Sequence, residues 1–269
     1  MILLDRLGQL FPQASRRSVK HWLQHGRVAV DGEVVRDGRV TVGPAARITL
    51  GRHGTVPFPP ALGLVHEDDE ILVIDKPPGL LTIAAPHERE RTAYRLVWDY
   101  LAAHRPSRRP FIVHRLDRET SGLLVFAKSA RAKRHLQSQF EARDVDRAYV
   151  AVVEGRVEDE QGTLESRLTQ DRTLRVRSGP RGKPAVTRYR VRARRADRTV
   201  LELSLGTGRR HQIRVQLADL GHPIIGDPLH GGRSHRHRRL CLHATRLGFV
   251  HPESGERMRF ESAAPSGWV

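Results

Sequence analysis

The stretch VHRLDRETSGLLVFAKS, residues 113–129, most constrains the fold, because a polar segment passes directly into a continuous apolar run. HRLDRETSG is rich in turn-forming residues, and LLVFA is apolar enough to be a buried strand. Asp117 is therefore expected on a loop whose far end is anchored in the core. Between Arg115 and Arg118 it is expected to stay ionised, which suits a nucleophile or a base. The alternative is a loop aspartate that only neutralises its neighbours.

Residues 1–50 change their hydropathic period part-way along. Leucines recur with helical spacing from Leu3, and Ser15 is expected to cap a second helix. HGRVAVDGEVVRDGRVTV then alternates apolar and polar residues around an Asp31-Gly32 turn, which predicts a short hairpin, and Ile48 and Leu50 predict a further strand. This region is expected to form two helices and a small sheet.

The chain of 269 residues is long enough for a large core plus a small additional unit. We expect a first domain over residues 1–50, a Gly- and Pro-rich linker over 51–62 and a second domain over 63–269. In the second domain, strands are expected at 71–74, 122–127, 148–154, 187–193, 200–205 and 247–250. Helices are expected over TAYRLVWDYLAAH and near 130–142 and 211–220. This order predicts an α+β fold with a mixed, largely antiparallel sheet.

Basic residues outnumber acidic ones by 47 to 30, so a positive surface field is expected, and nucleic acid is the first partner to consider. The alternative is that a high-GC genome simply encodes more arginine. Cys241 has no internal disulfide partner and no Cys cluster for a zinc site, which fits a reducing cytoplasm. No run approaches the roughly 18 apolar residues of a membrane span, so we expect a soluble cytoplasmic protein without an evident export signal.

A second polar stretch, residues 203–231, joins an expected strand to an expected helix through a Gly206-Thr207-Gly208 turn. Arg209, Arg210 and Arg214 follow the turn, and apolar residues at 213, 217 and 220 predict an amphipathic helix. Such a helix start can bind an anion, either a phosphate or the Asp117 carboxylate. The stretch is no Walker loop, because GxxxxGK[ST] is absent.

Three other features have competing interpretations. Tyr149 begins the apolar segment of RAYVAVVEG, as a core residue or as a platform on which a base stacks. His235 and His237 suggest a metal ligand pair, but no acid or thiol is near, so a solvated loop is favoured and no metal is predicted. Residues 173–195 look like a basic hairpin around Ser178-Gly179-Pro180 that grips RNA, or else an arginine-rich solvated sheet face.

Several blocks together resemble the RluA-type pseudouridine synthases of the RsuA/RluA superfamily. They are DKPPGLLT, VHRLDRETSGLLVFAKS, RAYVAVVEG, GKPAVTRYRV, TGRRHQIRVQLADLGHPIIGDPLHG and LCLHATRLGFVHP, in that family's order. The segment SRRSVKHWLQHGRVAVDGEVV resembles the S4 RNA-binding domain, which often precedes such a catalytic domain. The resemblance covers most of residues 62–262 and implies the pseudouridine synthase fold preceded by a small S4-like α+β domain.

The resemblance also implies an enzyme that turns uridine within RNA into pseudouridine without cofactor or metal. Asp117 matches the family's catalytic aspartate, Tyr149 the tyrosine that stacks on the base, and Arg209 the basic partner of the aspartate. Arg115 matches an arginine that helps displace the target nucleotide. In the S4-like region the expected RNA-binding residues are Arg16, Arg17, Lys20 and Arg27.

The chemistry needs a flipped uridine, a flat platform and an ionised carboxylate, whether Asp117 attacks the sugar or removes its 2′ proton. Two departures from the family pattern stand out. His230 occupies the Tyr position of the GDxxYG segment, so a local contact is expected to differ, and TIAAPHERERTAY departs from the commonest version. Neither departure affects the expected reaction.

Two other functions remain open at this stage. One is a non-enzymatic RNA-binding protein that acts through residues 1–50. The other is hydrolysis by Ser121 with His114, which the absence of a GxSxG elbow disfavours. The expected substrate is a structured ribosomal RNA, with transfer RNA as the second choice, and the expected oligomeric state is a monomer.

Overall fold

The structure is a computed structural model that describes residues 1–24, 26–51, 57–85, 88, 90–105, 107–171, 173, 175–231 and 239–268. Its helices are α1 (Leu3–Leu10), α2 (Arg16–Gln24), α3 (Ala93–His104), α4 (Ala130–Ala142) and α5 (Gln212–Asp219). The first strands are β1 (Val28–Val30), β2 (Glu33–Val34), β3 (Ile48–Leu50), β4 (Gly63–Glu67), β5 (Ile71–Lys76), β6 (Phe111–Ile112) and β7 (Ser121–Ala127). The others are β8 (Asp146–Glu154), β9 (Gln161–Gln170), β10 (Val176–Ser178), β11 (Lys183–Arg194), β12 (Arg198–Leu205), β13 (Leu242–Val250) and β14 (Arg257–Glu261).

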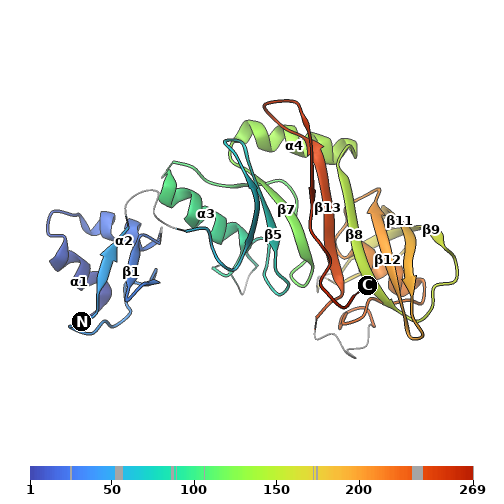
Figure 1. Ribbon diagram of the computed structural model, residues 1–269, viewed down its shortest axis with the longest axis horizontal. Helices are drawn as coiled ribbons and strands as arrows, with labels where there is room; N and C mark the ends of the chain where they lie inside the picture. The colour runs from blue at the N-terminus through green and yellow to red at the C-terminus, as the bar shows by residue number, and fades with distance from the viewer. Residues whose placement is uncertain are drawn as a thin grey trace.

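The N-terminal region forms the predicted two helices and small sheet, which lie at one end of the molecule (Figure 1). Ser15 Oγ accepts a hydrogen bond from the Ser18 N–H at 3.1 Å, as expected of a helix cap. Asp31 and Gly32 have φ values of 52° and 89°, the left-handed pair that a tight hairpin turn requires. The sheet order is β2-β1-β3, and the helices bury Leu3, Leu7, Val19 and Leu23 against it.

The rest of the described chain is built on one large sheet with the order β10-β9-β11-β12-β8-β13-β7-β5-β4, to which β14 and β6 add at β13 and β7 (Figure 1). Among the named strands of the described residues, only β13 and β7 pair in parallel, so the predicted largely antiparallel α+β fold is confirmed. At this parallel pair the two backbones approach closely. A Cβ on Gly122, whose φ is 110°, would lie 2.3 Å from the Ala244 carbonyl oxygen, so only glycine fits there.

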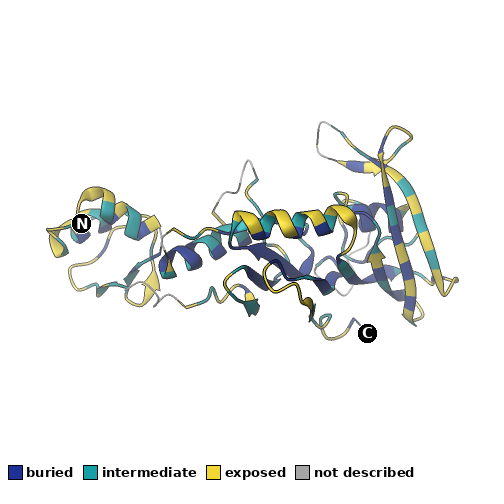
Figure 2. Cartoon of the chain, turned by 90° about the horizontal axis from the view of Figure 1, so that it is seen from above, coloured by how far each residue is buried: buried dark blue, intermediate teal, exposed yellow. Residues whose placement is uncertain are grey.

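Both faces of β7 are covered, which explains the continuous apolar run after Asp117. Leu124 and Phe126 face a core that includes Val97 of α3, whereas Leu123 belongs to a second core. That second core contains Ala132 and Leu136 of α4, whose exposed side is visible in Figure 2. Every residue of β7 is buried as a result, and the strand anchors the loop that precedes it.

Several edge elements differ from the sequence-based expectation. Strands β4, β6, β9 and β14 were not predicted, and β9 carries mostly exposed or half-exposed residues. The hairpin expected around Ser178-Gly179-Pro180 is wrong in its pairing. Both β10 and β11 pair with β9, so Ser178 and Lys183 lie on opposite sides of Leu168.

The N-terminal region contacts α3 through a shared carboxylate. Asp99 lies 2.9 Å from Nε of Arg36 in the N-terminal region and 3.1 Å from Nε of Arg95 on its own helix. Arg95 also donates to the Gln24 carbonyl oxygen at 2.8 Å. Because the Asp99 side chain is only 4% exposed, this is a buried charged contact between the two parts of the chain.

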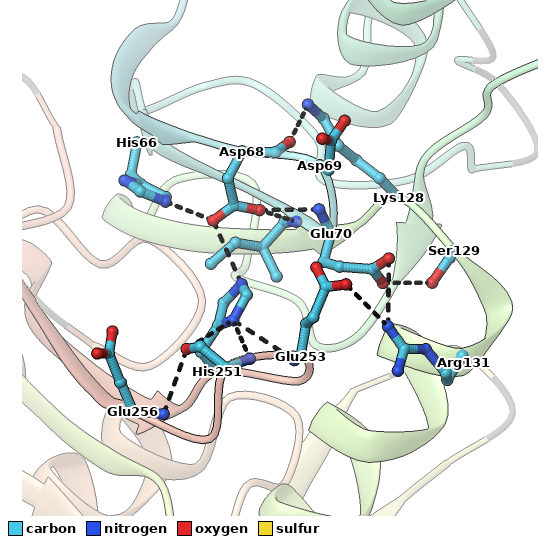
Figure 3. Close-up of polar contacts among 12 residues, drawn as sticks. His66, Asp68, Asp69, Glu70, Lys128, Ser129, Arg131, His251, Glu253 and Glu256 are labelled. Atoms are coloured by element: carbon cyan, nitrogen blue, oxygen red, sulfur yellow. Dashed lines mark hydrogen bonds and ion pairs between the residues drawn. The ribbon is translucent and has the colours of Figure 1, made fainter.

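Asp68 joins the β4–β5 turn to the turn that follows β13 (Figure 3). One carboxylate oxygen accepts from the backbone N–H groups of Glu70 and Ile71, both at 2.8 Å. The other lies 2.6 Å from His66 Nε2 and 3.3 Å from His251 Nε2. Asp68 therefore fixes the turn that starts β5, the neighbour of β7.

Two predictions fall wholly or partly outside the described residues: the histidines His235 and His237, and residues 52–56 of the expected linker. Within the described residues, no group of three or more His, Cys, Asp or Glu side chains is arranged to hold a metal ion. No described helix has the length and apolar character needed to cross a membrane.

Candidate active site

Asp117 lies in a cavity of about 630 Å³ between the β7 side of the sheet and the segment that leads into α5. The loop of residues 113–120 forms one wall, and Leu205 to Arg214 form the opposite wall. Tyr149 and Arg147 of β8 contribute part of the lining. The structure thus brings together the polar stretches that the sequence separates by almost a hundred residues.

Two buried side chains, those of Thr82 and Lys76, hold the backbone of the Asp117 loop in place. The Thr82 hydroxyl donates to the Leu116 carbonyl oxygen at 2.8 Å and accepts from the Leu116 N–H at 3.2 Å. Lys76 is fully buried, and its Nζ donates to the carbonyl oxygens of Pro77, Leu80 and Arg118. Burial lowers the pKa of Lys76 to about 7. The backbone on both sides of Asp117 is therefore fixed, so the point from which its side chain projects is defined.

Arg214 is the cation closest to the Asp117 carboxylate. Its Nη1 lies 3.6 Å from Asp117 Oδ2, and its Nε and Nη2 donate to the two oxygens of Asp227 at 2.7 and 2.6 Å. The side chains of Arg214 and Asp227 are 3% and 0% exposed, whereas that of Asp117 is 18% exposed. Asp227 therefore orients the guanidinium, and Asp117 faces it with an oxygen open to the cavity.

The ion pair expected between Asp117 and Arg209 does not form; Arg214 makes it instead. Arg209 donates from Nε to the Pro184 carbonyl oxygen at 3.2 Å and has no ion pair within the described residues. The flanking arginines also differ from expectation. Arg118 donates to the Gly79 carbonyl oxygen and lies 3.7 Å from Glu119, while Arg115 is exposed at the cavity wall. The charge that faces Asp117 thus comes from 97 positions downstream rather than from its neighbours in sequence.

The register of α5 explains why Arg214 rather than Arg209 points at Asp117. His211 precedes the helix with a φ of 52°, a left-handed conformation that bends the backbone directly before Gln212. Gln212 then accepts from the Arg209 N–H and the Thr207 hydroxyl and donates to the Val186 carbonyl oxygen. These contacts lock the turn and place Arg214, the third helical residue, under Asp117.

Helix α5 is less amphipathic than predicted. Gln212, Arg214 and Gln216 are buried together with Ile213 and Leu217, and Leu220, expected on the apolar face, is 40% exposed. The Gln216 amide donates to the carbonyl oxygens of Leu164 on β9 and Ala185 on β11. Polar side chains therefore attach this helix to the sheet, a role that apolar spacing alone does not reveal.

Tyr149 lines the cavity and is 7% exposed, and it also belongs to the main hydrophobic core, so both interpretations of this residue remain compatible with its position. Burial raises the pKa of its hydroxyl; the negative charge of Asp117 acts in the same direction, and Arg147 opposes them. The phenol therefore stays neutral at physiological pH. A flat, neutral ring beside a carboxylate is suited to hold a planar base.

His114 serves a structural purpose, which removes support for a serine hydrolase. Its ring stacks on Phe140 at 4.7 Å, and its Nε2 accepts a hydrogen bond from the Val125 N–H at 3.2 Å. Burial lowers the pKa of His114 to about 3, so the ring is neutral. Ser121 instead bonds to His243 Nδ1 at 2.8 Å, so the two candidate residues form no catalytic pair.

His230, which departs from the family pattern, contacts His211. Nε2 of His230 lies 3.2 Å from Nδ1 of His211, whose Nε2 is 3.9 Å from Asp117 Oδ2. Burial lowers the pKa of His211 to about 4 despite the nearby Asp117 carboxylate. A neutral imidazole therefore lies between His230 and the carboxylate, and the expected local difference is a bond between two histidines.

The basic residues predicted in the N-terminal region are placed differently from one another. Arg16, Arg17 and Lys20 are exposed on α2. Arg27 is half-buried, donates to the Gly51 carbonyl oxygen at 3.1 Å and lies over the Trp22 ring. Arg17 and Lys20 form no ion pair with any residue that the structure describes, whereas Arg16 Nη2 lies 4.0 Å from Asp5 Oδ1. The exposed helix residues can meet a phosphate backbone, and Arg27 also stabilises the small N-terminal fold.

Comparison with known proteins agrees with this arrangement. Residues 70–219 match the RNA pseudouridylate synthase family, and residues 3–48 match the S4 domain. The chain belongs to the RNA pseudouridylate synthase family. It is therefore an RNA-modifying enzyme rather than a purely RNA-binding protein, and the suspected resemblance is confirmed.

Similar proteins extend over nearly the whole chain. The "Ribosomal large subunit pseudouridine synthase D" of Haemophilus ducreyi is 34% identical over 98% of this chain and 87% of its own length. The protein of the same name from Xanthomonas campestris is 37% identical over 96% and 84%. Among solved structures, human RNA pseudouridylate synthase domain containing 1 has a TM-score of 0.61 and 26% identity, covering 75% of this chain and 83% of that one.

Proposed function

We propose that this enzyme isomerises specific uridines of large-subunit ribosomal RNA to pseudouridine, with Asp117 as the catalytic carboxylate. The names of the similar proteins support this RNA as the substrate. The observation that carries the residue assignment is the fixed Asp117 carboxylate, held 3.6 Å from a buried guanidinium in a cavity that also contains Tyr149. We further propose that the enzyme acts in the cytoplasm, as a monomer and without a cofactor.

The reaction breaks the C1′–N1 bond of uridine and forms a C1′–C5 bond; C5 loses its proton and N1 gains one, so the product is an isomer. Asp117 presents an exposed oxygen that is suited either to attack C1′ or to remove the 2′ proton. In this proposal Arg214, and not Arg209, holds that carboxylate. Tyr149 stacks on the uracil while it turns.

The target nucleotide must leave its stack to reach Asp117, at a cost of about a few kcal/mol. In this proposal Arg115, exposed at the cavity rim, supports the displaced nucleotide. Residues 1–50 act as the S4-like domain, where Arg16, Arg17, Lys20 and Arg27 contact the RNA backbone. Residues 63–269 form the catalytic domain, and 51–62 link the two.

The test is pseudouridine mapping, by carbodiimide labelling and primer extension, on total RNA from cells that lack this gene. We expect one or a few sites in large-subunit ribosomal RNA to disappear and to return with wild-type protein but not with Asp117→Asn. Loss of a site in transfer RNA would replace the proposed substrate. Full rescue by the variant would refute the role of Asp117.

A further inference from the structure

A second cavity of about 440 Å³ adjoins the one that contains Asp117. The two cavities share Gly208, Arg209 and Arg210, which form the wall between them. The other lining residues come from β9, β10, the turn between β10 and β11, and the first residue of β11; they are Leu168, Thr169, Gln170, Val176, Arg181, Gly182 and Lys183. An RNA strand that leaves the first cavity across this wall would therefore enter the second cavity.

The lining of the second cavity is strongly cationic. It contains Arg181, Lys183, Arg209 and Arg210 and no carboxylate. None of these four side chains forms an ion pair with any residue that the structure describes, whereas further along β11 Arg192 pairs with Glu202 at 3.0 Å. Unpaired like charges in one concave site repel each other, and a polyanion relieves that repulsion.

The backbone around the cavity keeps these cations in place. Arg209 is oriented by its bond to the Pro184 carbonyl oxygen, and Nε of Arg210 is buried without a hydrogen-bond partner among the described residues. Gly182 approaches the backbone of β9 so closely that a Cβ would lie 2.5 Å from a carbonyl carbon. Arg181 and Lys183 flank this contact, so their positions are tied to the sheet rather than to a free loop.

We propose that the second cavity binds the sugar–phosphate backbone of nucleotides next to the target uridine on the same RNA strand. This inference rests on the proposed function and adds to it a site for flanking phosphodiesters. This proposal also gives a role to Arg209, which does not pair with Asp117. Arg209 lines both the cavity for the base and the cavity for the backbone, so it can contact the RNA where the strand passes between them. The hydroxyl of Thr169 and the amide of Gln170 supply neutral hydrogen-bond donors.

The test compares two double variants that each remove two exposed cations. R181A/K183A removes charges from the cavity, and R188A/R190A removes charges from β11 outside the cavity. Both are assayed on a large-subunit ribosomal RNA transcript carrying tritium at uridine C5, across a series of KCl concentrations. Release of tritium reports the bond change at C5. Thermal unfolding checks that both variants are folded.

For R181A/K183A we expect KM to rise by roughly tenfold or more with kcat within about twofold of wild type. The slope of log KM against log salt should fall by about 1.4, that is about 0.7 for each lost phosphate contact on a single strand. R188A/R190A should behave like wild type. Equal effects of the two variants, or no effect of either, would overturn the phosphate site and leave the proposed function standing. If wild-type protein releases no tritium from this RNA, the proposed function fails and the site with it.

Discussion

The cations on helix α2 of the N-terminal region and the cation beside Asp117 in the catalytic region are held in opposite ways. Arg16, Arg17 and Lys20 stand exposed on α2. Arg214, by contrast, is 3% exposed and tied to Asp227 by two hydrogen bonds. Exposed cations attract a polyanion without fixing its geometry, whereas a buried, oriented cation fixes one carboxylate to within a fraction of an ångström. The comparison separates residues that capture RNA from residues that position the reacting groups.

The difference has an energetic basis. A buried ion pair is costly to desolvate and strongly destabilising when one partner is removed, whereas an exposed cation contributes little to folding. Burial raises the pKa of Asp227, but the hydrogen bonds and the charge of Arg214 lower it by more, so the net pKa lies below its usual value. At Arg214 activity and stability are therefore coupled, whereas at the exposed Arg17 and Lys20 they are not.

The largest effect is expected for Arg214→Ala. It leaves the buried Asp227 carboxylate unpaired and removes the cation beside Asp117, so unfolding should become easier by about 3–5 kcal/mol. Activity should fall by about 10³-fold or more, because an oriented charge is lost from the site. Urea unfolding and tritium release measure the two effects. Arg214→Ala with wild-type activity would contradict the assignment of Arg214 as the partner of Asp117.

Tyr149 provides the next test, because its ring and its hydroxyl are separable. Tyr149→Ala should lower kcat/KM by about 10- to 100-fold, since base stacking contributes about 1–3 kcal/mol. Tyr149→Phe keeps the ring and serves as the matched control, with activity within about fivefold of wild type. Equal losses for both variants would show that the hydroxyl, not the ring, is what the reaction needs.

A smaller effect is expected for R17A/K20A in the N-terminal region. Losing two exposed cations should raise KM about fivefold, flatten its salt dependence by about 1.4 and leave kcat and the unfolding free energy unchanged. R188A/R190A, with the same charge loss on the catalytic domain, is the control. A lower kcat for R17A/K20A would contradict the distinction between residues that capture RNA and residues that position the reacting groups.

The smallest effect concerns Asp68, which lies away from the cavity. Burial raises its pKa, but bonds from His66 and from the Ile71 and Glu70 N–H groups outweigh this and lower the pKa overall. A lowered folded-state pKa means that the stabilisation is present above the unfolded value of about 3.9 and is lost as the pH falls through the folded value. Asp68→Asn should therefore cost about 1 kcal/mol at pH 7 and progressively less below about pH 4. Urea unfolding across pH measures this difference, and tritium release should not change. A difference in unfolding free energy between wild type and Asp68→Asn that grows as the pH falls would contradict the prediction.

Local signals predicted much of the fold. The cap at Ser15, the Asp31-Gly32 turn and helix 130–142 follow from neighbouring residues alone, and the structure has them at those positions. The apolar run after Asp117 also indicated a buried strand correctly. Strand β9 was missed because its residues are largely polar and half-exposed, so its pattern resembles a loop.

The site was predictable in its parts but not in its pairing. Asp117 and Tyr149 line one cavity as expected, and Arg214 was among the cations considered as anion ligands. Which of Arg209 and Arg214 faces Asp117 depends on the left-handed conformation of His211, and no local sequence pattern predicts that conformation. Lys76 and Thr82, which hold the loop, act through carbonyl oxygens distant in sequence. Such contacts exist only after the sheet has assembled.

The central claim is that the carboxylate of Asp117 performs the isomerisation, while Arg214 positions this carboxylate and Tyr149 holds the base. The most direct measurement is single-turnover tritium release from the ribosomal RNA transcript by wild type and by Asp117→Asn, each at saturating enzyme. We predict at least about a 10³-fold slower rate for the variant, with unchanged RNA affinity and unchanged thermal unfolding. A variant that releases tritium at the wild-type rate would contradict the account.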